Sequence, residues 1–127
     1  MQSCRMRALV IDDDPEQIEL MKRMLEKLRF QTVTATNGTE GIMAFQNSRP
    51  DIVFLDIMMP GIDGFVTLRK IRSVSSDMGI KPKIFMLTAK SGTADVMNAI
   101  KFGATDYLVK PIIEARLLEK LQKHVKL

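Results

Sequence analysis

The sequence predicts an α/β domain in which a five-stranded parallel sheet is covered by helices on both faces. Short apolar runs alternate with longer amphipathic segments five times along the 127 residues. Several of these runs are continuously apolar, as in strands that are buried on both faces. Parallel strands joined in this way need right-handed crossovers, and the chain length suits one such doubly wound domain.

The first strand is predicted at residues 8–11, a continuous apolar run. A helix follows, because Asp14, Pro15 and Gln17 suit an N-cap, the first helical position and the third. Apolar residues then recur at helical spacing: Ile18, Met21, Leu25 and Leu28. The second strand is predicted at 31–35, where the more polar sequence favours an edge of the sheet.

The remaining elements continue the alternation of strand and helix. In the middle of the chain, we expect a helix that begins at Asn37-Gly38 and a strand at 52–55. A turn at 60–64 follows, and then a helix through Leu68 and Ile71 that ends in the polar stretch 73–79. The last part predicts a strand at 84–87, a helix over about 93–102 closed by Gly103, a strand at 107–109, and a helix carrying Leu117, Leu118, Leu121 and Val125.

The composition excludes several classes of protein. A single cysteine and a single histidine rule out a disulfide framework and a Cys/His zinc site. The longest apolar run, 52–59, is interrupted by Asp56, and the first seven residues lack the apolar core of a signal peptide. We therefore expect a cytoplasmic domain that does not enter a membrane.

The net charge of +4 raises the question of nucleic-acid binding. The basic residues are scattered along the chain, and six Phe, one Tyr and no Trp leave few side chains to stack on bases. Direct nucleic-acid binding by this domain is therefore not expected. Asp12, Asp13 and Asp14 are consecutive, however, and their mutual repulsion favours a bound cation.

Polar residues follow four of the five predicted strands. Asp12 and Asp13 follow the first, Asp56 the third, Thr88 the fourth and Lys110 the fifth. The carboxyl ends of parallel strands lie on one edge of the sheet, where open α/β folds bind ligands. These side chains are therefore expected to converge in one crevice.

The chemistry of this set points to magnesium and a phosphoryl group. A hard divalent cation relieves the repulsion of three carboxylates. The Lys110 ammonium and the Thr88 hydroxyl suit a tetrahedral oxyanion, and a carboxylate is the best nucleophile in the set. Each residue alone has a structural alternative: Asp14 as an N-cap, Thr88 as a strand end, and Lys110-Pro111 as an ordinary turn. Their joint placement favours the site.

Four motifs in order make the chain resemble the receiver domains of response regulators in two-component signalling, including the chemotaxis regulators. They are the acidic pocket in 9–15, the phosphorylation-site segment 51–64, the pair Thr88-Ala89, and the segment 107–111 that ends in Lys110-Pro111. The resemblance covers about residues 7–126, the core of a single receiver domain over 1–127. It implies a flavodoxin-like (βα)5 fold with strand order 2-1-3-4-5.

The resemblance implies that Asp56 accepts a phosphoryl group from a phosphohistidine of a sensor kinase or histidine phosphotransfer protein. Asp12 and Asp13 would hold Mg²⁺ together with Asp56 and the backbone carbonyl of Met58. Lys110 would pair with the phosphoryl group. The protein would then be a phosphoacceptor switch, with self-phosphorylation and self-dephosphorylation as its only chemistry.

The phosphoryl oxygens would also bond to the Thr88 hydroxyl and the Ala89 N–H. The Lys110-Pro111 peptide resembles the cis bond of the family. On phosphorylation, Thr88 would shift and Tyr107 would turn inward. This would change the surface of the fourth helix, fifth strand and fifth helix, where an effector or output domain binds. Phosphorylation-dependent dimerisation is compatible with the family, as are a single-domain regulator and a receiver within a larger regulator or hybrid kinase.

In the family, the residues at two positions affect the rate at which the acyl phosphate is hydrolysed. In this sequence these residues are Met58 and Lys90. The apolar side chain of Met58 cannot form a hydrogen bond that would orient an attacking water, which predicts slow to moderate self-dephosphorylation. His124 is expected to be a solvated residue near a helix end.

Three rival functions are weaker. A hydrolase of the haloacid-dehalogenase type needs a second Asp where Met58 stands. The complete set of site residues argues against a binding module that has lost phosphorylation. The scattered charge argues against a nucleic-acid binder.

Overall fold

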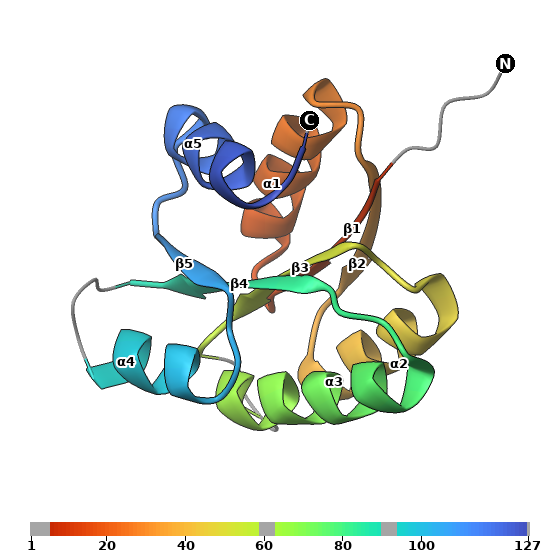
Figure 1. Ribbon diagram of the computed structural model, residues 1–127. Helices are drawn as coiled ribbons and strands as arrows, with labels where there is room; N and C mark the ends of the chain where they lie inside the picture. The colour runs from red at the N-terminus through yellow and green to blue at the C-terminus, as the bar shows by residue number, and fades with distance from the viewer. Residues whose placement is uncertain (1–5, 59–62, 90–93, 127) are drawn as a thin grey trace, which may run out of the picture.

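The computed structural model describes residues 6–58, 63–89 and 94–126 and forms one five-stranded parallel sheet (Figure 1). The strand order is β2-β1-β3-β4-β5, which confirms the predicted topology. The strands are β1 (Arg7–Ile11), β2 (Gln31–Ala35), β3 (Ile52–Asp56), β4 (Lys83–Thr88) and β5 (Asp106–Val109). The helices are α1 (Pro15–Lys27), α2 (Gly38–Ser48), α3 (Gly64–Met78), α4 (Ala94–Lys101) and α5 (Glu114–His124).

Helices cover both faces of the sheet. α1 and α5 lie on one face, and α2, α3 and α4 lie on the other (Figure 1). Alternate side chains of β1 pack on opposite faces of the sheet: Val10 packs with α1 and α5, whereas Leu9 packs with α2 and α3. The central strand β3 is buried along its whole length, as its continuous apolar run predicts. β2 is partly exposed at the edge, also as predicted.

The helix starts follow the local sequence signals. The side chains of Asp14, Asn37 and Asp63 accept hydrogen bonds from backbone N–H groups in the first turns of α1, α2 and α3. α3 continues through the polar stretch to Met78 and ends at Gly79, whose φ of 73° is left-handed. Residues 60–62 of the predicted turn, Lys90 and Thr93 lie outside the described residues. Within the described residues, no helix is long and apolar enough to cross a membrane.

Candidate functional site

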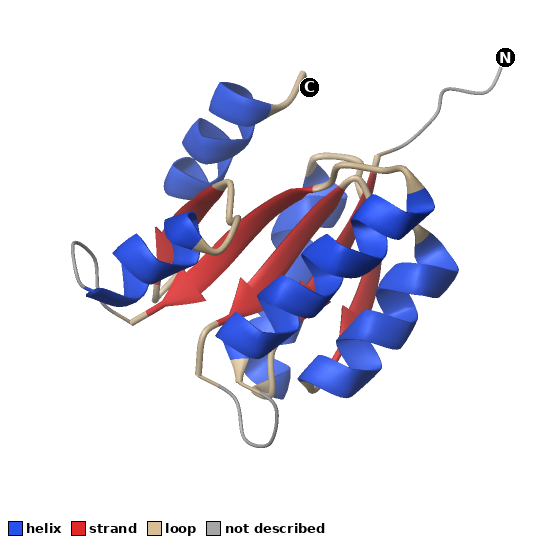
Figure 2. Ribbon diagram, turned by 60° about the horizontal axis from the view of Figure 1, so that its bottom comes forward, coloured by secondary structure: helices blue, strands red, loops and turns tan. Residues whose placement is uncertain are grey.

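The carboxyl ends of the strands lie along one edge of the sheet (Figure 2). The register aligns these ends, since Ile11 pairs with Leu55 and Asp56 pairs with Leu87. Thr88 is the last residue of β4, and the Lys110 N–H donates a hydrogen bond of 2.7 Å to its carbonyl. The parallel sheet therefore brings the predicted polar residues to one place.

Asp12 is the buried carboxylate at the centre of this edge. Its side chain has no exposed surface. Its Oδ1 accepts a hydrogen bond of 3.0 Å from the Asp14 N–H. The ammonium of Lys110 lies 3.0 Å from its Oδ2. The Lys110–Pro111 peptide bond that precedes α5 is cis.

Asp56 ends β3 and shares the same lysine. Its Oδ1 lies 3.3 Å from the Lys110 ammonium and accepts a hydrogen bond of 3.2 Å from the Met58 N–H. Burial, followed by the charge of Asp12, raises the pKa of Asp56 to about 6 despite the opposing effect of Lys110. Burial lowers the pKa of Lys110, but its contacts with the two carboxylates outweigh burial and raise it overall.

The acidic residues fit a hard divalent cation. Carboxylate oxygens of Asp12, Asp13 and Asp56 all lie within 4.8 Å of one another. Oδ2 of Asp12 is buried and, within the described residues, accepts no hydrogen bond of good geometry, although Lys110 lies near it. Carboxylates of this kind, with a backbone carbonyl and water, are the ligands that Mg²⁺ prefers. Met58, whose N–H donates to Asp56, is exposed.

Thr88 and Ala89 stand at the end of β4 beside this cluster. Thr88 is buried, whereas Ala89 is exposed. The adjacent strand carries Tyr107, which is half-buried and packs against the core on the α2–α4 face. The Lys120 ammonium of α5 lies 4.5 Å from the centre of the Tyr107 ring, within the range of a cation–π interaction.

A second group of charged side chains, absent from the sequence predictions, joins β5 to α5. Oδ1 of Asp106 accepts a hydrogen bond of 2.8 Å from the Lys120 ammonium, and Oδ2 lies 2.8 Å from Nε2 of His124. Burial raises the pKa of Asp106, but the hydrogen bonds with Lys120 and His124 and from the Tyr107 N–H outweigh it and lower the pKa overall.

This arrangement corrects the expectation that His124 is solvated. Its side chain is only 19% exposed, and its ring also lies beside Phe85, with 5.6 Å between the ring centres. The spacing of Lys120 and His124, four residues apart on one helix, was the available signal. The partner, Asp106, is distant in sequence, and no local pattern points to it.

Comparison with known proteins gives a consistent picture. The profile of the response regulator receiver domain family matches residues 8–122. The chain is 36% identical over 126 residues to the DNA-binding response regulator MtrA of Mycolicibacterium smegmatis, covering 99% of this chain and 53% of that protein. It is 34% identical over 115 residues to the protein PilH of Pseudomonas aeruginosa, covering 91% and 93%. The chain thus spans about half of MtrA but nearly all of PilH.

Solved structures show the same fold. The chemotaxis protein CheY4 of Vibrio cholerae superposes with a TM-score of 0.87 at 28% identity, covering 94% of this chain and 98% of that one. The receiver domain of the sensor histidine kinase PA1611 from Pseudomonas aeruginosa has a TM-score of 0.82 at 27% identity, covering 94% and 97%. That structure contains a magnesium ion coordinated in the active-site cleft.

Proposed function

Because this chain belongs to the response regulator receiver domain family of two-component signalling, we propose that it is a switch phosphorylated on Asp56. The observation that carries the proposal is the position of the Lys110 ammonium, 3.0 Å from Asp12 and 3.3 Å from Asp56. One cation thus faces a buried acidic pair at the edge where α/β sheets bind ligands.

The phosphoryl donor in this proposal is the phosphohistidine of a sensor kinase or histidine phosphotransfer protein. The ionised Asp56 carboxylate attacks phosphorus, a carboxylate O–P bond forms, and the N–P bond breaks with its electron pair returning to the imidazole. This step needs no general base, because the aspartate is already a nucleophile when ionised. Lys110 balances the charge that arrives with the phosphoryl group.

Asp12, Asp13, Asp56 and the backbone carbonyl of Met58 are the proposed Mg²⁺ ligands. The bound ion would neutralise the negative charge of the carboxylates and the phosphoryl oxygens. The convergence of the three carboxylates supports this assignment, as does the magnesium ion in the cleft of the PA1611 receiver domain.

The Thr88 hydroxyl and the Ala89 N–H are the proposed donors to the phosphoryl oxygens. Movement of Thr88 toward the phosphoryl group would leave space for Tyr107 to turn inward. Contacts that exist only with phosphate would then shift the equilibrium between two arrangements of the α4–β5–α5 surface. The contact between Lys120 and Tyr107 supports a link to α5.

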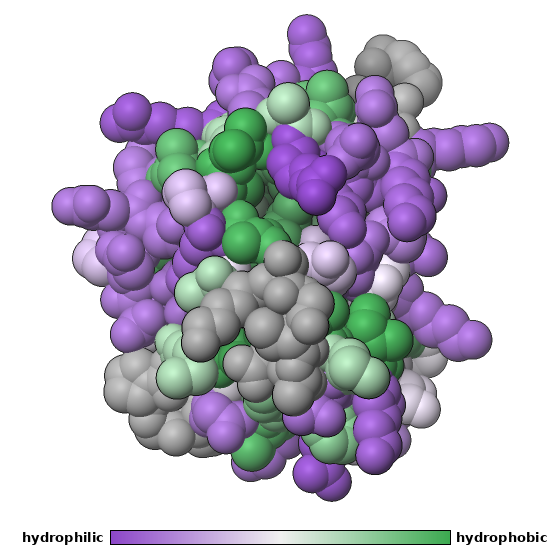
Figure 3. Space-filling view, turned by 90° about the vertical axis from the view of Figure 1, so that its left-hand side faces the viewer, coloured by the Kyte–Doolittle hydropathy of each residue, from purple (hydrophilic) through white to green (hydrophobic). Residues whose placement is uncertain are grey.

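The α4–β5–α5 surface is the proposed site for a downstream effector or an output domain. Figure 3 faces this side of the molecule and shows apolar side chains among polar ones. Exposed apolar residues occur on α4, just after it and just before α5: Met97, Ile100, Phe102 and Ile113. We place a single receiver domain over 1–127, acting in the cytoplasm without direct nucleic-acid contact. Dimerisation on phosphorylation belongs to the same proposal.

The experiment that tests this function is intact-mass spectrometry after incubation with acetyl phosphate. Wild type, Asp56→Asn and the control Asp77→Asn, on the exposed face of α3, are compared with and without Mg²⁺. We expect one metal-dependent phosphoryl addition to wild type and the control, and none to Asp56→Asn. Equal addition to Asp56→Asn would exclude Asp56 as the acceptor. No addition to any variant would contradict the switch.

A further inference from the structure

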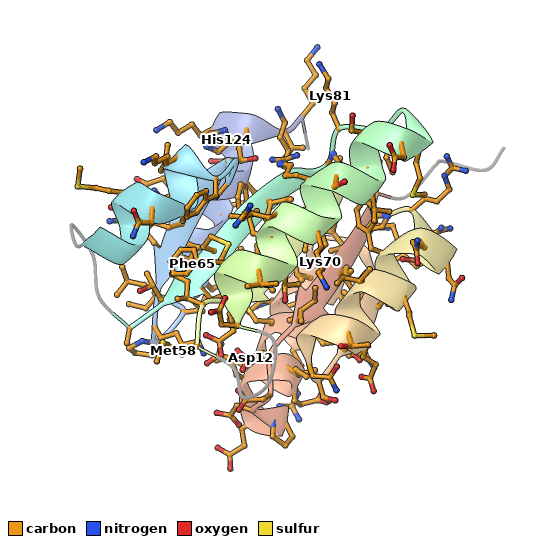
Figure 4. All side chains as sticks on the ribbon, turned by 90° about the horizontal axis from the view of Figure 1, so that it is seen from below. Asp12, Met58, Phe65, Lys70, Lys81 and His124 are labelled. Atoms are coloured by element: carbon orange, nitrogen blue, oxygen red, sulfur yellow. The ribbon has the colours of Figure 1, made fainter. Side chains whose placement is uncertain are left out.

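A cavity of ≈ 500 Å³ lies at the end of the sheet opposite the phosphorylation site, where β4 and β5 begin. Its walls come from the end of α3 and the loops before β4 and β5, and include Arg72, Ser76, Ile80, Lys81, Lys83 and Thr105. Figure 4 shows Lys81 and Asp12 at opposite ends of the molecule. The cavity is therefore distinct from the acidic site.

Arg72 is a half-buried cation that is held by neutral groups. It donates from Nε to the Gly103 carbonyl at 2.7 Å, and from its terminal nitrogens to the Pro82 carbonyl at 2.9 Å and the Thr105 hydroxyl at 3.4 Å. Within the described residues, no carboxylate forms an ion pair with it. A guanidinium has five N–H donors, so two remain for a ligand.

The position of the guanidinium is fixed by the backbone around it. Gly103 has a φ of 107°, and a Cβ at this position would lie 3.2 Å from Cγ and 3.3 Å from Nε of Arg72. The absence of a side chain at residue 103 thus allows the arginine to pass close to the chain. Burial without a counter-charge lowers the pKa of Arg72, as expected for a cation that lacks an anionic partner.

Two lysines add to the positive charge at the same cavity. Lys83 is partly exposed at the start of β4, and Lys81 is exposed at the mouth. Asp77 of α3 is close in sequence but is not part of the cavity wall. Three cations around one cavity repel each other, and an anion with more than one charge would remove that repulsion.

We infer that this cavity binds the phosphate group of a small molecule. A guanidinium offers paired donors to phosphate oxygens, and lysines act as point charges that approach from other directions. Ser76, whose hydroxyl can donate a hydrogen bond, also lines the wall. Ile80 and Pro82 form an apolar part of the wall, which suits the organic part of a phosphate monoester.

The test is an NMR titration of the whole chain with inorganic phosphate and, separately, with phenyl phosphate at constant ionic strength. We expect saturable shifts of the Gly79 and Thr105 amides at the cavity. The double variant Lys81→Gln/Lys83→Gln should weaken binding about tenfold, since it removes two charge-assisted contacts. The control Lys70→Gln/Lys101→Gln removes the same charge from exposed positions on α3 and α4 and should bind as wild type does.

Tighter binding of phenyl phosphate would identify a monoester as the ligand, and equal binding of the two probes would identify free phosphate. Shifts that increase linearly with concentration would overturn the inference. The same holds for shifts confined to Met58 and Ala89, or for equal weakening by the two double variants. These outcomes do not depend on phosphorylation of Asp56.

Discussion

The Lys110 ammonium lies 3.0 Å from Oδ2 of Asp12, and the same nitrogen lies 3.3 Å from Oδ1 of Asp56. One cation therefore faces two buried carboxylates, with a third carboxylate, Asp13, close by. Burial of Asp56, followed by repulsion from Asp12, raises the pKa of Asp56 to about 6. In the metal-free protein, ionisation of Asp56 should therefore cost stability at neutral pH.

Removal of the Asp56 charge should stabilise the metal-free protein. The folded pKa of about 6 lies above the ordinary aspartate pKa of 3.8, so the folded state binds more protons between these values and the cost of ionisation is complete above pH 6. One pKa unit corresponds to about 1.4 kcal/mol, so Asp56→Asn should raise the free energy of unfolding by up to about 3 kcal/mol at pH 7. Urea unfolding in EDTA measures this difference.

The stabilising effect of Asp56→Asn should decrease as the pH falls from 7 to 4, because wild-type Asp56 becomes protonated in the folded state. The control Asp77→Asn, at an exposed position, should show no comparable change. A variant that is less stable than wild type at pH 7 would contradict the role of repulsion.

Magnesium should stabilise the wild-type protein through the three carboxylates. At a concentration ten times Kd, a ligand that binds only the folded state adds about 1.4 kcal/mol. Asp13 is exposed, so Asp13→Asn should keep the fold but require much more Mg²⁺ for the same rise in Tm. Differential scanning fluorimetry over a Mg²⁺ series measures this, with Asp77→Asn as the control. Superimposable Mg²⁺ curves for wild type and Asp13→Asn would exclude Asp13 as a ligand.

Asp106→Asn should destabilise the protein at neutral pH by about 1–3 kcal/mol, since it weakens the hydrogen bonds with Lys120 and His124. The folded pKa of Asp106 is lowered, so the folded state binds fewer protons and this stabilisation is present above the ordinary aspartate pKa of 3.8. It should be lost as the pH falls further. Urea unfolding at pH 7 and pH 3 tests this, and a loss that is unchanged at pH 3 would argue for a packing effect instead.

The acyl phosphate on Asp56 should hydrolyse slowly, with a lifetime of minutes or longer. Met58 is 76% exposed and offers water no polar side-chain group. Met58→Asn should accelerate dephosphorylation by at least about tenfold, because its amide can orient water. Loss of the phosphoryl mass with time measures the rate, with Met43→Asn on α2 as an exposed control. A wild-type half-life of a few seconds would refute this prediction.

Gly64→Ala should displace the end of β3 and reduce phosphorylation of Asp56. A Cβ at residue 64 would lie 2.6 Å from Cα and 2.8 Å from the carbonyl oxygen of Ile57, both backbone atoms. Overpacking of this kind costs about 1–3 kcal/mol. At Gly41 a Cβ would meet side-chain atoms of Ile11 instead of backbone atoms, so Gly41→Ala should cost less. Urea unfolding and acetyl phosphate labelling of both variants test the comparison.

The predictable part of the structure is the part that local patterns encode. The apolar runs predicted the five strands, and the parallel topology then predicted that Asp12, Asp56, Thr88 and Lys110 meet at one edge. The links of Asp106 to His124 and of Arg72 to Gly103 were not predictable in this way. They join residues 18 and 31 positions apart and depend on how α5 and α3 sit on the sheet.

The hydrogen bonds of Arg72 also bear on the proposed switch. They anchor α3 to Pro82, just before β4, and to Gly103 and Thr105, just before β5. The other ends of these two strands carry Thr88 and precede Lys110. Arg72 thus holds the starts of β4 and β5 against α3, whereas the residues proposed to contact the phosphoryl group lie at the other ends of these strands. We expect displacements on phosphorylation to increase along β4 and β5 with distance from Arg72.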